Sequence, residues 1–311
     1  MPSHGNFVTS HISNLYMTKP ATTIDEQLDL LKTRGLVIQD EDKAREILLD
    51  IGYYRLGFYL FPFEKSYPQL RNRTHEYIDG ATFEDAVKLY YFDFDLRLLL
   101  TRYLTRIEIA FRTALIYNLS NKYSPNSVWF ISPSVVSRSY ARDFENKVYT
   151  ADFKRNPIIQ RHHQKNPNDR FAPSWKTLEF MTFGAVMKLY EQLKERDDKI
   201  LIAQKLGIRQ VVTFESYMHT IREVRNACAH GHLLYDLRLP RRINRGPAHI
   251  TPQESGNIVG ALRVIRYMMA QISTKRADDL SASVKSLYEK LCMEAPNLKP
   301  LMPDFSCIRE N

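Results

Sequence analysis

The chain is poor in cysteine, and it contains no long apolar run. Its three cysteines, Cys228, Cys292 and Cys307, are too few and too scattered for a disulfide framework or a CxxC metal site. No run of 18 apolar residues is present, so the sequence predicts no membrane-spanning helix. Residues 1–16 lack the basic start and apolar block of a secretory signal. We therefore expect a protein of the reducing cytoplasm with no membrane partner.

The composition indicates a helical, basic protein. Eleven glycines are few for 311 residues, and the long apolar patterns repeat at helical spacing, which predicts an all-α fold. Hydrophobic residues make up 44% of the chain and charged residues 25%, as in ordinary soluble globular proteins. Forty-four Lys and Arg against 35 Asp and Glu give a net charge of +9, which favours an anionic partner.

The pattern predicts a single helical domain over residues 21–296, between a flexible N-terminus (1–20) and a C-terminal tail (297–311). Helices are expected to begin at these positions: Thr23, Asp40, Thr82, Ser174, Thr213, Thr251 and near Leu280. Residues 124–174 contain five prolines and the basic run 161–165, which predicts a long exposed insertion with one short helix. The adjacent His162 and His163 have no partner at metal-ligand spacing, so they are weak evidence for a metal.

The hexamer from Arg225 to His230, RNACAH, contains residue types that suit RNA cleavage without a metal. Arginine keeps its charge and can bind a phosphate, while histidine ordinarily titrates close to neutral pH. The hexamer lies at the end of a predicted helix and is followed by an arginine-rich segment. This placement makes Arg225, Asn226 and His230 the candidate catalytic residues.

Helical geometry constrains how these side chains can meet. Arg225 falls within the apolar stripe of the predicted helix, where a charge is costly unless a partner neutralises it. His230 lies about 140° from Arg225 around a straight helix, so one straight helix cannot aim both at one phosphate. Either the helix bends or ends near Gly231, or a second copy shares the site across a two-fold axis. We favour the shared site.

Two further groups are candidates for supporting roles. Residues 233–250 form a predicted irregular basic loop. Its arginines, with one arginine of the preceding helix and one histidine, are expected to bind phosphates: Arg222, His232, Arg238, Arg241, Arg242 and Arg245. Glu108 lies four residues before Arg112, which favours a surface ion pair. Alternatively, Glu108 neutralises or orients Arg225.

Arg225, Asn226 and His230 resemble the Arg-polar-x-x-x-His signature of the HEPN superfamily of all-helical RNases. Several ordered blocks between about Lys19 and Tyr235 resemble the abortive-infection AbiD/AbiF group within it. These blocks are residues 23–27 (TIDEQ), 34–36 (RGL), 52–56 (GYYRL), 89–93 (LYYFD), 106–108 (RIE), Trp175 with Glu179, and 183–184 (FG). Blocks in this order are far more specific than the hexamer alone.

The resemblance implies a HEPN-type helical bundle, here with extra N-terminal helices and a basic insertion. It also implies a homodimer, metal-free RNA cleavage, phage defence through host shutdown, and a cognate structured small RNA as a possible partner. Residues 231–235 (GHLLY) depart from the family pattern, in which arginine and tryptophan are expected after the histidine. This departure leaves the substrate preference open.

The predicted reaction is attack of the RNA 2′-hydroxyl on the adjacent phosphate, with His230 as general acid or base and Arg225 stabilising charge. Asn226 would orient His230 or the phosphate, and no cofactor is expected. One alternative is a non-catalytic RNA-binding module. Another is metal-dependent hydrolysis through His230, His232, His219 and Asp236. A purely structural role, with Arg225 paired to a buried carboxylate and His230 at a helix end, also fits.

Overall fold

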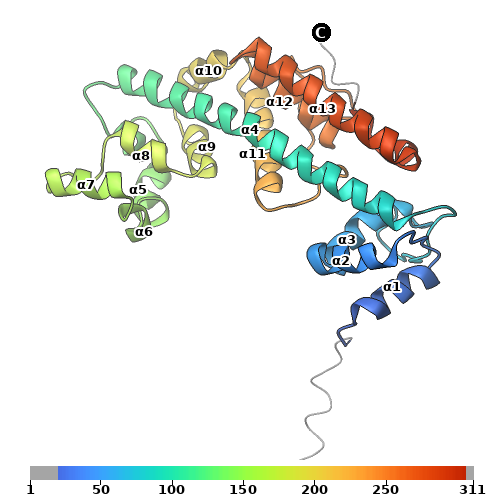
Figure 1. Cartoon of the computed structure of the whole chain (residues 1–311). Coiled ribbons are helices and arrows are strands. Elements are labelled where there is room, and N and C mark those ends of the chain that lie inside the picture. Colours follow the sequence, from blue (N-terminus) through green and yellow to red (C-terminus); the bar gives the residue numbers. More distant parts are fainter. Residues whose placement is uncertain (1–19, 306–311) are drawn as a thin grey trace, which may run out of the picture. The chain divides into compact units, whose positions relative to one another are not determined.

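The computed structural model describes residues 20–305, which form α-helices and connecting loops (Figure 1). Within that range the only β pairing is in isolated bridges, so the prediction of an all-α fold is confirmed. The chain divides into two compact units, residues 1–87 and 88–311. The prediction of one domain over residues 21–296 stays a prediction. The predicted flexible N-terminus, residues 1–20, and the last residues of the tail, 306–311, lie outside the described range except for residue 20.

The first unit contains three short helices, α1 (Ile24–Thr33), α2 (Glu41–Ile51) and α3 (Tyr53–Leu60), followed by the 3-10 turn η1 (Phe61–Phe63). Thr23 and Glu26 cap α1 reciprocally: each backbone N–H donates to the side chain of the other residue. The Asp40 carboxylate accepts from the Lys43 N–H and caps α2. The predicted starts of both helices are therefore confirmed.

The second unit is organised around the long helix α4 (Phe83–Lys122), whose first turns cross the boundary between the units. The predicted apolar face of this helix is buried, including Leu100, Ile107 and Phe111. The ring of Phe111 lies 5.7 Å from that of Tyr190 in α9 (Phe183–Glu191) and 5.9 Å from that of Phe214 in α11 (Val211–Ala229). Helix α4 is therefore the surface on which α9 and α11 pack.

Residues 124–174 are not an exposed insertion with a single short helix. They contain the turn η2 (Trp129–Ile131) and the helices α5 (Arg138–Lys147), α6 (Ala151–Lys154) and α7 (Pro157–Lys165). These elements surround a buried aromatic cluster: Trp129, Phe130, Phe144, Tyr149 and Phe171. His162 is buried, and Nε2 of His163 lies 2.8 Å from the Tyr149 hydroxyl. The prolines of this segment start and end short helices, and the aromatic residues between them supply the core.

The helices after residue 173 differ from the pattern in several places. The helix expected from Ser174 is two helices, α8 (Ser174–Phe180) and α9, because Thr182 starts the second one by accepting from the Ala185 N–H. Helix α10 (Arg196–Lys205) was not predicted, since its apolar residues are consecutive rather than periodic. Helix α12 (Ile258–Ala270) begins seven residues after Thr251, at a cap formed by Asn257. Thr251 instead closes a separate turn with Glu254.

The C-terminal region is more ordered than a tail. Helix α13 (Thr274–Glu294) leads into the 3-10 helix η3 (Pro296–Leu301), and Phe305 beyond it is fully buried. The ring of Phe305 lies 5.4 Å from Phe92 on α4 and 5.5 Å from Tyr288 on α13. Residues 297–305 therefore close one end of the second unit. Every helix in residues 20–305 is too short or too polar to cross a bilayer.

Candidate active site at the end of helix α11

The candidate catalytic residues occupy the C-terminal end of α11. The predicted apolar stripe packs this helix into the core, since Phe214, Tyr217 and Val224 have no exposed surface. The helix ends at Ala229, and Gly231 adopts a left-handed conformation with φ of 66°. The backbone N–H groups of Gly231 and His232 donate to the carbonyls of Cys228 and Ala227, as in a Schellman C-cap. The predicted helix end near Gly231 is confirmed.

His230 lies in the cap position and is exposed to solvent. Its backbone N–H donates to the Asn226 carbonyl at 3.0 Å, and its ring centroid lies 6.0 Å from that of His232. The Asn226 side chain is half-buried one turn earlier. Because the helix ends here, the imidazole of His230 is no longer held to the direction that a continued helix would impose. Whether His230 and Arg225 meet on one phosphate stays a prediction.

Arg225 is half-exposed and is held by a carboxylate of α4. Its Nε lies 3.7 Å from Oε2 of Glu108, and 41% of its side-chain surface is accessible. The other carboxylate oxygen of Glu108 accepts from Nη2 of Arg112 at 2.8 Å. Arg112 also donates to the backbone carbonyls of Leu178 and Met181. Glu108 therefore lies between two arginines, one structural and one available to a ligand.

The pair of Glu108 and Arg112 is not on the surface. Only 15% of the Glu108 side chain and 9% of the Arg112 side chain are accessible, which corrects the expectation of a solvent-exposed ion pair. The i,i+4 spacing identified the partner, but the spacing gives no information on burial. The contacts of Arg112 with the chain near α8 cover this part of α4. The second expectation for Glu108, a contact with Arg225, agrees with the 3.7 Å separation.

Replacement of Glu108 by alanine is expected to lower the free energy of unfolding by about 1.5–3 kcal/mol, because buried Arg112 loses its charged acceptor. Glu289→Ala, which removes an exposed i,i+4 partner of Lys285 on α13, should cost less than about 0.5 kcal/mol. Urea unfolding followed by circular dichroism measures both. Similar small losses for the two variants would show that Glu108 has only a local surface role.

A buried ion pair on α4 fixes the backbone that follows His230. The Asp93 carboxylate accepts from the backbone N–H groups of Leu234 at 3.0 Å and Tyr235 at 2.8 Å, and it pairs with Arg97. Arg97 donates to the carbonyl of His232 at 3.2 Å. We call this set of contacts the loop anchor. Asp93 and Arg97 were not among the predicted site residues, although their i,i+4 spacing on an apolar helix face is a sequence signal for this pair.

The basic loop, residues 233–250, runs over α11 without forming a helix, as predicted. Its backbone is tied to that helix: the N–H of Asn244 donates to the Ser216 hydroxyl at 2.9 Å, and the N–H of Ala248 donates to the Tyr217 hydroxyl at 3.1 Å. At Gly246 a Cβ would lie 2.6 Å from Cγ2 of Thr213, so only glycine allows this close approach.

The loop arginines differ in their partners. Arg238 lies 3.4 Å from Asp236, and on α11 Arg222 lies 2.9 Å from Glu223. By contrast, three exposed arginines make no hydrogen bond or ion pair with any residue in the 20–305 range: Arg241, Arg242 and Arg245. Exposed His232 lies between the helix end and this loop. The loop that follows the motif therefore carries positive charge that the described chain does not neutralise.

Two further features concern the cysteine of this helix end and the metal-ligating residue types of the described chain. Burial raises the pKa of the Cys228 thiol to about 12, so the thiol stays protonated and is a poor nucleophile at neutral pH. Among residues 20–305, no group of three or more His, Cys, Asp or Glu side chains is arranged to hold a metal ion.

Comparison with protein families gives a match over residues 46–236 to the family described as Abi-like protein. The matched segment includes α4, the loop anchor and the whole RNACAH hexamer, and it covers more than half of the chain. Comparison with curated proteins and with solved structures gives no match. The extent of the family match shows that this chain belongs to the Abi-like proteins.

Proposed function

We propose that this protein is a metal-independent endoribonuclease of the HEPN type that acts in the cytoplasm in abortive-infection defence against phage. The observation that carries the proposal is the end of α11. There, an exposed histidine follows a half-exposed arginine, and the loop that continues from them returns along α11 with three arginines that have no partner in the described chain. Membership of the Abi-like family supports the defence role.

The proposed chemistry is transfer of phosphate to the RNA's own 2′-oxygen. The 2′-oxygen forms a bond to phosphorus and loses its proton to an imidazole, while the bond from phosphorus to the 5′-oxygen breaks. The leaving 5′-oxygen takes up a proton, and the products end in a 2′,3′-cyclic phosphate and a 5′-hydroxyl. Arg225 stabilises the negative charge that grows on the phosphate oxygens.

A homodimer would supply the second imidazole that this reaction can use. One His230 would accept the proton of the 2′-hydroxyl, and the His230 of a second copy would protonate the leaving oxygen. Two exposed histidines at the ends of two α11 helices suit such an arrangement, because neither is enclosed by its own chain. Asn226, half-buried one turn before His230, would orient the imidazole or the phosphate.

The loop arginines also favour a second candidate, a module that binds a structured small RNA without cutting it. Both candidates require a phosphate-binding face, and they differ only in turnover. The family resemblance and the exposure of His230, five residues after half-exposed Arg225, favour the nuclease. In the nuclease, a small RNA would instead be a regulatory partner.

The deciding experiment incubates the purified protein with total RNA in excess EDTA and maps the ends of the products. We expect cleavage with 2′,3′-cyclic phosphate ends and no cleavage of the same sequences as DNA. The Arg225→Ala variant, with folding verified by circular dichroism, should lose cleavage by about 10²–10³-fold, as expected for loss of one charge-stabilising group. Binding of RNA without turnover would instead identify the non-catalytic module. Efficient cutting of DNA would refute the proposed chemistry.

A further inference from the structure

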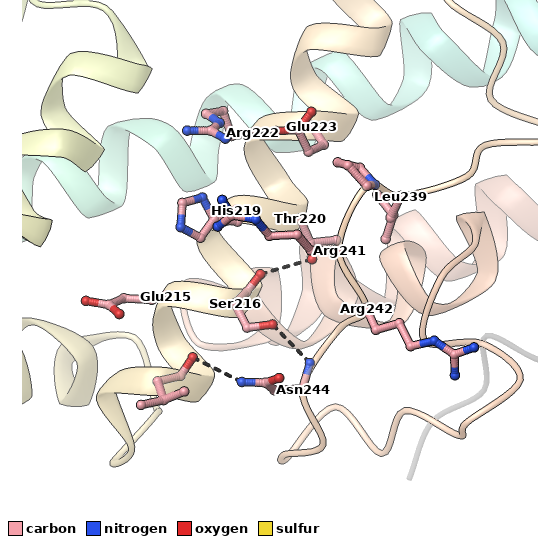
Figure 2. Close-up of a pocket in the computed structure, with 12 residues that line it drawn as sticks. Glu215, Ser216, His219, Thr220, Arg222, Glu223, Leu239, Arg241, Arg242 and Asn244 are labelled. Atoms are coloured by element: carbon pink, nitrogen blue, oxygen red, sulfur yellow. Dashed lines mark hydrogen bonds and ion pairs between the residues drawn. The ribbon is translucent and has the colours of Figure 1, made fainter.

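A cavity of about 410 Å³ lies between α11 and the basic loop. Its wall on the helix includes Glu215, His219 and Arg222, and its wall on the loop includes Arg241 and Asn244 (Figure 2). The loop wall is fixed, since the backbone N–H of Asn244 is bonded to Ser216 on the helix. The volume lies in the range of small-ligand sites, about 300–1,000 Å³.

The cavity carries positive charge that has no partner. The carboxylates on its wall are used, because Glu223 pairs with Arg222 at 2.9 Å and Glu215 lies 3.4 Å from Lys199. Arg241 makes no hydrogen bond or ion pair within residues 20–305. Figure 2 shows its side chain reaching across the cavity toward His219. An anionic ligand would therefore gain a charge-assisted contact without breaking an existing one.

His219 supplies a flat and uncharged surface in this cavity. Its Nε2 lies 3.3 Å from the Glu191 carboxylate, and its buried Nδ1 has no hydrogen-bond partner in the described chain. Burial lowers the pKa of His219, and the nearby Arg222 and Arg241 lower it further, against the opposing effect of Glu191. This shift favours the uncharged form of the ring. A neutral aromatic ring beside an arginine can stack against a nucleobase.

We infer that this cavity binds one nucleotide of a single-stranded RNA, with a phosphate on Arg241 and the base against His219. The inference rests on the proposed nuclease function in that it treats the cavity as part of the substrate path. From residue 219 to residue 230 the helix rises about 16 Å. A stacked strand advances about 3.4 Å per nucleotide. The bound nucleotide thus lies roughly five nucleotides from the cleaved bond.

The basic loop favours an RNA strand over a free nucleotide. Arg242 also lines the cavity, but in Figure 2 its side chain points away from Arg241 and His219. Arg245 follows farther along the loop, again exposed and without a partner in the described residues. A mononucleotide would use Arg241 alone, whereas a strand would also place phosphates on these outer arginines.

The test measures binding of a fluorescein-labelled, mixed-sequence 12-nucleotide RNA by anisotropy, in a His230→Ala background that prevents turnover. Arg241→Ala is expected to weaken binding about tenfold at moderate salt and to reduce the salt dependence by about one phosphate contact. Arg138→Ala is the matched control, since Arg138 is an exposed arginine of α5 with no partner in the described chain. It should change the affinity less than twofold. Arg241→Lys should recover part of the loss.

Separate measurements distinguish the possible failures. Equal losses of RNA affinity for Arg241→Ala and Arg138→Ala would overturn the assignment of a nucleotide to the cavity, because only the overall charge would then matter. Tight binding of AMP, GMP, CMP or UMP that requires Arg241, with RNA affinity unchanged, would overturn the RNA assignment in favour of a free nucleotide. A third outcome is RNA binding that depends on Arg241 while the wild-type protein, which retains His230, never cleaves RNA. That result would support the nucleotide-binding cavity and refute the nuclease.

Discussion

His230→Ala is expected to lower the rate of RNA cleavage by about 10²–10⁴-fold, the usual contribution of one general acid or base. The imidazole is exposed at the cap of α11, and it contributes no buried contact that holds the helix end. The backbone bonds of the Schellman cap remain available to alanine, since they involve only N–H and carbonyl groups. The folded state should therefore survive while turnover is lost. Single-turnover cleavage of a defined RNA in EDTA measures the rate.

His232→Ala is the informative comparison, because its ring centroid lies only 6.0 Å from that of His230 and it is also exposed. As a phosphate-binding residue, His232 should affect KM more than kcat, whereas His230 should affect kcat. We expect the kcat of His232→Ala to stay within about threefold of the wild type. A kcat loss in His232→Ala as large as that in His230→Ala would contradict the assignment of the acid-base role to position 230.

Several helix starts and ends around this site could be predicted from local sequence signals. Thr23 with Glu26 and Asp40 marked two helix starts, and Gly231 marked the end of α11, because capping is decided by a few neighbouring residues. The same kind of signal misled at Thr251, where a reciprocal cap with Glu254 closes a turn that does not continue as α12. A cap therefore marks a possible start, and the residues after it determine whether a helix follows.

Burial and long-range pairing were not accessible in the same way. The prolines at 124–174 suggested an exposed segment, yet Trp129 and Tyr149 there are fully buried. The contact of Arg225 with Glu108 joins residues 117 positions apart, so the sequence could offer it only as an alternative to the local pair with Arg112. The loop anchor joins Asp93 to backbone N–H groups 141 and 142 residues away. Every residue except proline carries a backbone N–H, so sequence patterns do not show which N–H groups will bind a given carboxylate.

The loop anchor links the helix that forms the core to the segment that carries the proposed substrate contacts. On one side, Asp93 and Arg97 belong to α4 and are buried. On the other side they hold residues 232–235, which connect His230 to the basic loop. The position of the loop arginines relative to the helix end thus depends on a buried charge pair.

Asp93→Asn is expected to lower the free energy of unfolding by about 3–5 kcal/mol, because it leaves the Arg97 charge buried without its partner. The amide also places an NH₂ group where the carboxylate accepted from Leu234, Tyr235 and Arg97. Urea unfolding monitored by circular dichroism measures the loss. At temperatures where the variant is folded, RNA cleavage should also fall, since the chain after His230 is no longer held.

Asp95→Asn provides the matched control, because Asp95 is an exposed aspartate two residues away on the same helix with no partner in the described chain. It should change stability by less than about 0.5 kcal/mol. The double variant Asp93→Asn with Arg97→Met should recover part of the loss, since it removes the uncompensated charge instead of leaving it buried. Equal stability of the Asp93 and Asp95 variants would show that the buried pair does not hold the loop.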